Sequence, residues 1–260
     1  MTNSLLFPEE KVKHRHWSPL VALVLACASF VPARAAQPWA SAVEPDWPSV
    51  AGTYPAVGSL QSQEEDAILH WLQDTRTRAD VDRVEVESHP DLDCFLNAIR
   101  SSWGASAYPT TKALLKQAKE DVKPVVTALK ASFRRPRPHV TDPTLTPALP
   151  DDGSLSFPSK HAAEGDLFAA ILIQLDPGDG VSLAEEGKLI GDDRAMAGVH
   201  WPSDVLAGQR LGQIFAAYWL GLPENAQMIQ DASAEWNNPK KAKGPGAVDA
   251  RASLQVDRFR

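Results

Sequence analysis

One long stretch of regularly spaced apolar residues limits what this chain can fold into. Between Pro109 and about Ser132, apolar side chains recur every three or four positions, which is the spacing of one face of an α-helix. Pro109 suits the first turn of such a helix, and Pro124 inside the pattern is expected to kink it. The apolar face consists of Leu114, Leu115, Ala118, Val122, Val125, Val126 and Leu129. The pattern therefore predicts a long helix.

The rest of the chain repeats the helical spacing in shorter stretches. Ser62-x-x-Glu65 and Ser182-x-x-Glu185 have the pattern of capping boxes at two helix starts. Residues 134–153 contain five prolines without a period, which predicts a loop. We expect helices over 62–75, 79–88, 92–99, 161–175 and 202–220, one that begins near Ser182 and carries Arg194, and a short one after Pro223. Because no run alternates like a strand, the sequence predicts an all-α fold with a single domain.

The N-terminus has the three parts of an export signal. Residues 11–16 are basic, Trp17 to Val31 is apolar, and Ala33-Arg34-Ala35 has the small-x-small pattern of a cleavage site. The apolar run is shorter than the roughly 18–20 residues that span a bilayer, which disfavours an uncleaved anchor. A lipoprotein signal at Cys27 is less favoured still, because Leu25 is bulky for that motif. We therefore expect a periplasmic or secreted protein without a membrane span in the mature chain.

These signals divide the chain into four segments. We expect a signal peptide over 1–35, an irregular lead-in over 36–60, a helical domain over 61–222, and a C-terminal helix with a polar tail over 223–260. The sequence leaves the oligomeric state open, so an oligomer is one option.

Charge and cysteine content exclude some classes of function. The 260-residue chain has a net charge of −7, and loss of residues 1–35 would make it −9, with 22 basic and 31 acidic residues. Such a chain is a poor candidate for nucleic-acid binding, which needs a basic face. Cys94 would be the one cysteine of the mature chain, so we expect no internal disulfide and a buried Cys94.

Three polar stretches stand out against this acidic background. Residues 130–138 hold four cations, Lys130, Arg134, Arg135 and Arg137, and no acid. Ser159, Lys160 and His161 follow a proline at the start of an apolar helix, with Ser159 placed as the N-cap. A helix N-terminus with unpaired backbone N–H groups is a ready site for an anion.

The third stretch places Arg194, His200 and Asp204 on an apolar framework. A carboxylate four residues from a histidine can fix the tautomer of the ring, which leaves the other ring nitrogen as a base or nucleophile. The guanidinium of Arg194 is a planar fork that suits an oxyanion such as phosphate. A histidine and an aspartate at this spacing are also common as a plain surface pair.

Together the three stretches resemble the signature of the type 2 phosphatidic acid phosphatase superfamily, and most closely its class A bacterial nonspecific acid phosphatases. That signature reads Lys-x6-Arg-Pro, Pro-Ser-Gly-His and Ser-Arg-x5-His-x3-Asp. Here it is Lys130-x6-Arg137-Pro138, Pro158-Ser159-Lys160-His161 and Asp193-Arg194-x5-His200-x3-Asp204. The resemblance covers about residues 62–222. Lys160 stands where the family has Gly, and Asp193 where it has Ser. One hypothesis is that these opposite charges compensate each other, as a direct pair or through the field of a bound phosphate. The alternative is that both side chains point to solvent.

The resemblance implies a role for each matching residue. His200 would be the nucleophile that forms a phosphohistidine, Asp204 would orient it, and His161 would be the general acid. Lys130, Arg137, Ser159, Lys160 and Arg194 would bind the phosphate. Arg134 and Arg135 are expected in solvent or behind the residues that touch phosphate. His70 and His89 lack matching partners and are expected on the surface or satisfied in the core.

The resemblance implies a helical bundle of the acid phosphatase and vanadium haloperoxidase type, and an acid phosphatase that hydrolyses small phosphomonoesters. Phosphate or vanadate would inhibit it, and no cofactor or metal is expected, since no HExxH, CxxC or carboxylate cluster is present. Two alternatives stay open. One is a vanadium-dependent haloperoxidase, for which the chain is short. The other is a non-catalytic periplasmic phosphate-binding protein in which Lys160 and Asp193 have abolished turnover.

Overall fold

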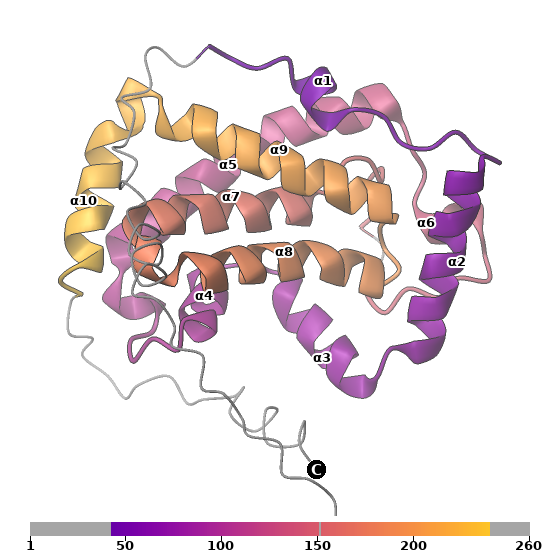
Figure 1. The fold of residues 1–260 in the computed structure, drawn as a ribbon, viewed down its shortest axis with the longest axis horizontal. Helices are drawn as coiled ribbons and strands as arrows, with labels where there is room; N and C mark the ends of the chain where they lie inside the picture. Colours follow the sequence, from indigo (N-terminus) through magenta and orange to yellow (C-terminus); the bar gives the residue numbers. More distant parts are fainter. Residues whose placement is uncertain (1–42, 151, 240–260) are drawn as a thin grey trace, which may run out of the picture. The chain divides into compact units, whose positions relative to one another are not determined.

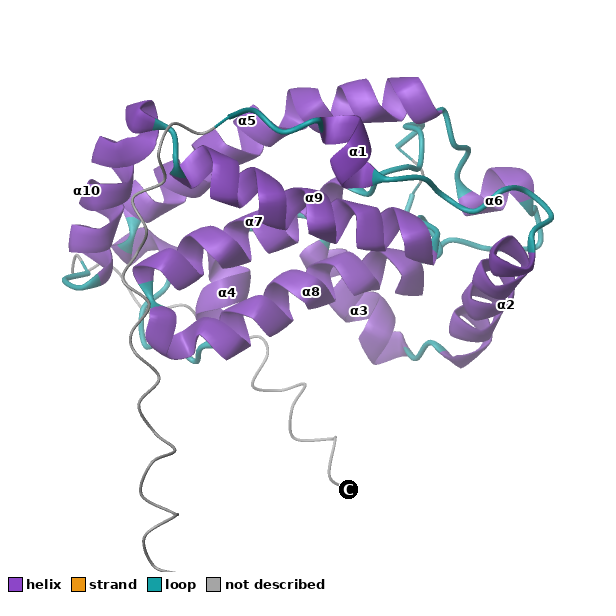
Figure 2. Ribbon diagram, turned by 45° about the horizontal axis from the view of Figure 1, so that its top comes forward, coloured by secondary structure: helices purple, strands orange, loops and turns teal. Residues whose placement is uncertain are grey.

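Three central helices carry most of the residues that stand out in the sequence. The computed structural model describes residues 43–150 and 152–239, and within these ranges it contains helices and loops but no strand, which confirms the all-α prediction. Helix α7 (Lys160–Leu175) packs against both α8 (Gly180–Met196) and α9 (Pro202–Leu220). The three helices lie side by side in both ribbon views (Figures 1 and 2).

Two glycines allow α9 to approach α7 closely. A Cβ added to Gly208 would lie 2.3 Å from the backbone oxygen of Ser159, and one added to Gly212 would lie 2.3 Å from that of Ala163. Any larger side chain would therefore push the two helices apart. At the same contact, the backbone N–H of Ser159 donates to the carbonyl of Asp204 at 2.9 Å. The close packing thus sets the second polar stretch directly beside the third.

Helix α5 (Pro109–Phe133) is the long helix that the apolar spacing predicted. Its expected apolar face is buried, except that Val125 is only partly covered, and the helix continues through Pro124. It packs against α7 and against α10 (Ala226–Trp236). The carboxylate of Glu235 in α10 accepts hydrogen bonds from the backbone N–H groups of Thr110 and Thr111 at 3.1 and 2.8 Å. This carboxylate satisfies donors that the first turn of α5 would otherwise leave unpaired.

The N-terminal helices pack against α8. Helices α2 (Leu60–Thr75), α3 (Arg78–Glu87) and α4 (Leu92–Ala98) begin and end within two residues of their predicted positions. Both predicted capping boxes are wrong. Helix α2 is capped by Ser59, so Glu65 lies a full turn further in and is buried. Helix α8 begins at Gly180, directly after a 3₁₀ turn at Pro177–Asp179, so Ser182 lies inside the helix and does not cap it.

Two segments that were expected to be irregular contain short helices. Helix α1 (Trp47–Ala51) lies in the predicted lead-in, where the Trp47 ring packs against Phe215 and Tyr218 of α9. Helix α6 (Pro138–Thr141) is a single turn in the predicted loop. Further 3₁₀ turns occur at Ala105–Ala107 and Pro223–Asn225. The predicted signal peptide and the tail beyond residue 239 lie outside the described residues.

Two smaller predictions can be compared with the described residues. Cys94 is buried, with 5% of its surface exposed, as expected. In the part of the chain that the structure describes, no helix combines the length and the apolar character needed to cross a membrane.

Candidate active site

A cavity of about 460 Å³ brings residues of all three polar stretches together. It is enclosed by α5, by the segment between α6 and α7, and by the start of α7. Its lining consists of Lys123, Val126, Thr127, Lys130, Ala131, Arg137, Asp152, Gly153, Ser154, Leu155, Lys160, His161 and His200. Ser159, Arg194 and Asp204 are buried and are absent from that lining. The structure therefore brings Lys130, Arg137, Lys160, His161 and His200 to one cavity.

His200 lies directly before α9 and is 1% exposed. Its Nδ1 faces Oδ2 of Asp204 at 3.4 Å, across the first turn of that helix. The hydroxyl of Ser156 donates to the same carboxylate oxygen and lies 3.5 Å from Nδ1. Burial, followed by the charge of Arg137, lowers the pKa of His200 well below 6.5. The shift favours the neutral form of the ring.

Both oxygens of the Asp204 carboxylate accept hydrogen bonds. The backbone N–H of Trp201 donates to Oδ2 at 2.9 Å, and Nη1 of Arg135 donates to Oδ1 at 2.7 Å. Burial raises the pKa of Asp204, and Arg135 opposes that rise. Because its lone pairs are taken up by fixed donors, the carboxylate can hold the His200 ring in one orientation.

Arg135 is a buried link between α2 and the start of α9. It is 5% exposed, and besides Asp204 it donates to Oε2 of Glu65 at 2.7 Å and to the Ser203 hydroxyl at 2.7 Å. The other oxygen of Glu65 accepts the backbone N–H of Ser203 at 2.6 Å. The guanidinium also lies 5.0 Å from the centre of the Trp201 ring. Of the two expectations for Arg135, the structure supports a place behind the cavity lining.

Arg137 is fixed in the cavity wall by four hydrogen bonds. Its Nη1 donates to the carbonyl of Val199 at 2.6 Å, and Nε donates to that of Ser154 at 2.9 Å. Nη2 donates to the Ser154 hydroxyl at 2.7 Å and to Oδ1 of Asp152 at 2.9 Å. Because these contacts fix its plane, Arg137 would bind an anion without reorganising.

Lys130 projects from the last turns of α5 and bonds the carbonyl of Leu155. Burial, followed by the charge of Arg137, lowers its pKa to about 7. The pKa of this ammonium is therefore sensitive to an anion in the cavity, which would raise it again.

Arg194 lies in the last turn of α8 and is 7% exposed. Its Nε and Nη1 are buried and have no hydrogen-bond partner among the described residues. Burial lowers the pKa of Arg194 to about 10, so the side chain is still a cation at neutral pH. A buried cation with two unpaired donors favours binding of a hydrogen-bond acceptor, such as an anion, at this position.

The start of α7 supplies the second histidine. Ser159 caps the helix, with its hydroxyl accepting from the backbone N–H of Ala162 at 3.4 Å. Nε2 of His161 lies 2.9 Å from the carbonyl of Ser88, and since a carbonyl only accepts, Nε2 carries a proton. Burial, then the charge of Arg194, lowers the pKa of His161 well below 6.5. Its Nδ1 is therefore the ring nitrogen open to proton exchange with a ligand.

The two departures from the family signature do not meet. Asp193 is 2% exposed, and Nε and Nη2 of Arg83 in α3 each donate to one of its carboxylate oxygens at 2.8 Å. Lys160 instead has Glu164 as its nearest carboxylate, at 4.0 Å one turn along α7. A direct Lys160–Asp193 pair, an attractive hypothesis from sequence alone, is therefore wrong. Asp193 is neutralised from outside the cavity.

Sequence reasoning missed Glu65, Ser156 and Arg83. Glu65 and Arg83 lie 138 and 110 residues from the partners they contact in the third stretch, so no local spacing marks them. The one available signal was the Ser-x-x-Glu pattern around Glu65, which indicated a helix cap instead. A charged residue within the apolar face of a helix can also be one member of a buried ion pair, and Glu65 is such a residue.

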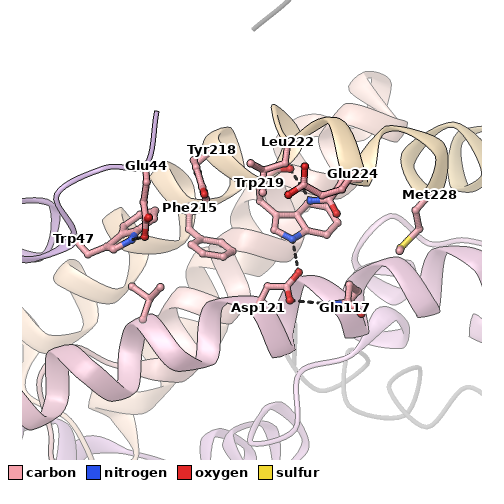
Figure 3. Close-up of a pocket in the computed structure, with 12 residues that line it drawn as sticks. Glu44, Trp47, Gln117, Asp121, Phe215, Tyr218, Trp219, Leu222, Glu224 and Met228 are labelled. Atoms are coloured by element: carbon pink, nitrogen blue, oxygen red, sulfur yellow. Dashed lines mark hydrogen bonds between the residues drawn. The ribbon is translucent and has the colours of Figure 1, made fainter. Parts of the chain in front are cut away.

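Two other features of the described chain lie outside this cavity. Asp66, His70 and Asp142 place one potential metal-ligand atom each within 4.8 Å of one another, and His70 pairs with Asp142 at 2.8 Å. A second cavity of about 450 Å³ is bordered by α1, α5, α9 and α10, and there Asp121 accepts from the Trp219 indole at 2.7 Å (Figure 3). None of its lining residues is basic, so it is a poor site for phosphate.

The fold and the cavity define an all-α protein with a buried, cationic candidate site for an anion. Residues 122–227 match the model of the PAP2 superfamily, which holds the type 2 phosphatidic acid phosphatases. The matched range contains all three motifs. Over this range, which carries the candidate site, the chain is similar to the PAP2 superfamily.

Characterised relatives are similar to parts of this chain. The nonspecific acid phosphatase of Salmonella typhimurium is 32% identical over 113 residues, which is 42% of this chain and 45% of that protein. The nonspecific acid phosphatase of Providencia stuartii is 26% identical over 200 residues, or 72% of this chain and 79% of its own. The match thus spans less than half the length of the Salmonella protein. A transmembrane phosphatidylglycerolphosphate phosphatase of PAP2 type from Bacillus subtilis aligns with a TM-score of 0.49 and 22% identity, over 69% of this chain and 92% of its own.

Proposed function

We propose that this protein is an exported acid phosphatase that hydrolyses small phosphomonoesters through a phosphohistidine at His200. The observation that carries the proposal is the pair of unused, buried donors on Arg194, which acts electrostatically on both His161 and His200. A phosphoryl group bound to those donors, Lys130 and Arg137 would have positive charge around its equatorial oxygens, as phosphoryl transfer requires.

The two histidines fit the two chemical roles. Nδ1 of His200 faces Asp204, so Nε2 would attack phosphorus while the bond from phosphorus to the ester oxygen breaks. A bound phosphate would offset the positive charges that lower the pKa of His161, so the ring could take up a second proton and donate it from Nδ1 to the departing oxygen. Water would then attack the phosphohistidine and return a proton to Nδ1 of His161, which releases inorganic phosphate. The lowered pKa of His200 favours the neutral ring, which is the nucleophilic form.

The contacts of Asp193 remove the main argument for the non-catalytic alternative. A carboxylate against the bound phosphate would weaken binding, but both oxygens of Asp193 are engaged by Arg83. Export is inferred from the sequence of residues 1–35.

The function is tested with purified protein and p-nitrophenyl phosphate at pH 5–7. We expect turnover without added metal, inhibition by phosphate and vanadate, and an acid-labile, base-stable phosphoprotein on rapid quenching. His200→Ala should abolish both turnover and labelling. Near-normal activity of His200→Ala would contradict the mechanism. Oxidation of bromide by peroxide with vanadate, without ester hydrolysis, would instead support the haloperoxidase.

Export has a separate test. N-terminal sequencing of protein from the cell envelope should find a start near Ala36. An intact Met1 in a cytoplasmic fraction would contradict export and leave the catalytic proposal untouched.

A further inference from the structure

We propose that the cavity selects phosphomonoesters that carry a second phosphate-like anion, which Lys160 and Lys123 bind beyond the reacting phosphate. This inference rests on the proposed function, which it refines by naming a class of substrate. The cavity holds more positive charge than one phosphate needs. Lys130 and Arg137 in the lining, with the buried Arg194 behind it, suffice to surround a phosphate, yet the lining also contains Lys123 and Lys160.

The acidic side chains nearby do not use up this extra charge. Among the described residues of the lining, Asp152 is the one that carries a carboxylate, and it is bound to Nη2 of Arg137 at 2.9 Å. Glu164 lies 4.0 Å from the Lys160 ammonium, beyond hydrogen-bond distance, and its other oxygen faces Lys119 at 3.2 Å. Lys123 has only a surface contact with Glu120 at 3.7 Å, a kind of pair that contributes little.

Lys160 occupies the first position of α7, where the family signature has Gly. Its side chain is 37% exposed, so the ammonium can meet a ligand that enters from solvent. Its charge reaches into the cavity, because it contributes to the lowered pKa values of both His161 and Lys130. Lys160 is also one of the residues that line the cavity.

Lys123 extends the same wall away from the reacting phosphate. Lys123, Val126, Thr127 and Lys130 recur with helical spacing and all line the cavity, so they share one face of α5. Seven residues of helix separate the two lysines, which is about 10 Å along the axis. A second anion bound near Lys123 would therefore lie several ångströms from the reacting phosphorus, with the apolar side chain of Val126 between.

The volume of the cavity agrees with an extended substrate. At about 460 Å³ it has room for an organic group in addition to a phosphate. The net charge of the whole chain is −7, so the lysines make a local positive field in an otherwise acidic protein. Such a field would attract a dianionic substrate more strongly at low ionic strength.

The test compares two esters of equal length, 4-hydroxybutyl phosphate and 4-phosphonobutyl phosphate. The phosphonate cannot be hydrolysed, so each ester has one reacting phosphate. We expect kcat/KM of the wild-type protein to be about tenfold higher for the phosphono ester at low salt. In Lys160→Gly and in Lys123→Ala this ratio should fall about three- to fivefold, the scale of a partly exposed ion pair. Lys116→Ala, an exposed lysine of α5 outside the cavity, is the charge-matched control and should keep the wild-type ratio.

A wild-type ratio near one, or a ratio that neither cavity variant changes, would overturn the inference. Calorimetric titration of the same proteins with butane-1,4-bisphosphonate and butylphosphonate measures the preference without turnover. If the wild type hydrolyses neither ester yet binds the bisphosphonate more tightly through both lysines, the proposed function fails and the second anion site stands. Equal affinity for the two phosphonates would remove the site whatever the activity.

Discussion

Nη1 of Arg135 donates to Oδ1 of Asp204 at 2.7 Å, with both side chains almost completely buried. The pair joins the first polar stretch to the third, and through Glu65 it also reaches α2. Arg135 thus holds the carboxylate that faces His200. Because it touches neither the cavity nor a substrate there, its role is that of a positioning residue.

The first prediction concerns Arg135. Arg135→Met should lower kcat at least about tenfold with little change in KM, and Arg135→Lys should recover part of the loss. Without the guanidinium the pKa of Asp204 should rise further, so the acid limb of the kcat profile should move to higher pH. Removing one partner of a buried pair costs about 3–5 kcal/mol, so Tm is measured in parallel. Arg134→Met, at the exposed neighbouring position, is the control. A lower Tm with an unmoved acid limb would mean that Arg135 only stabilises the fold.

The second prediction concerns His161 as the proton donor. His161→Ala should lose roughly 10²–10⁴-fold in kcat/KM for an alkyl phosphate, whose alkoxide leaves poorly, and much less for p-nitrophenyl phosphate. The cause is that nitrophenolate needs little protonation as it departs. Steady-state kinetics with both esters checks this. Equal losses would assign His161 to binding alone.

The third prediction concerns Lys130 and pH. Its pKa is about 7 in the fold and 10.5 without it, so between these values the unfolded chain binds more protons. The contribution of Lys130 to the free energy of unfolding should therefore rise with pH from 7 to 10.5 and be flat below 7. Urea unfolding of wild type and Lys130→Met over this range gives the difference directly. A difference that falls with rising pH would contradict the assignment.

The loss of the Lys130 charge above pH 7 should also weaken the binding of phosphate. Since the ammonium favours phosphate, the affinity of the wild type for inorganic phosphate should weaken above pH 7 relative to that of Lys130→Arg, whose guanidinium stays charged. The ratio of the two dissociation constants cancels the ionisation of phosphate itself.

The fourth prediction concerns the pair of Asp193 with Arg83. It replaces the hypothesis that Lys160 and Asp193 compensate each other's charge. Asp193→Ser leaves Arg83 without its buried partner and should destabilise the fold by about 2–3 kcal/mol. In a double-mutant cycle of unfolding free energies, Asp193→Ser should couple to Arg83→Met by about 1 kcal/mol or more. The matched cycle with Lys160→Gly should be additive within about 0.5 kcal/mol. Strong coupling to Lys160 and none to Arg83 would restore the earlier hypothesis.

The sequence by itself determined the helical fold and named the residues of the candidate site. The apolar period placed α5 and α9 almost to the residue, because a helix that buries one face must repeat its apolar side chains every three to four positions. The three motifs identified Lys130, Arg137, His161 and His200, because each motif combines characteristic residue types at short, fixed spacings. Five of the residues expected in the site line one cavity.

Only the tertiary structure decided which charges face one another. The partner of Asp204 comes from the loop after α5 and that of Asp193 from α3, and Glu65 comes from α2. These contacts join residues about 70 or more apart in the chain. No local pattern encodes such pairs, since they depend on how closely α7 and α9 pack at Gly208 and on which polar groups that packing buries. A buried charge needs a partner of opposite charge, and the tertiary fold decides which residue supplies it. Arg135 therefore pairs with Asp204 behind the candidate site, whereas Asp193 pairs with Arg83 outside the cavity.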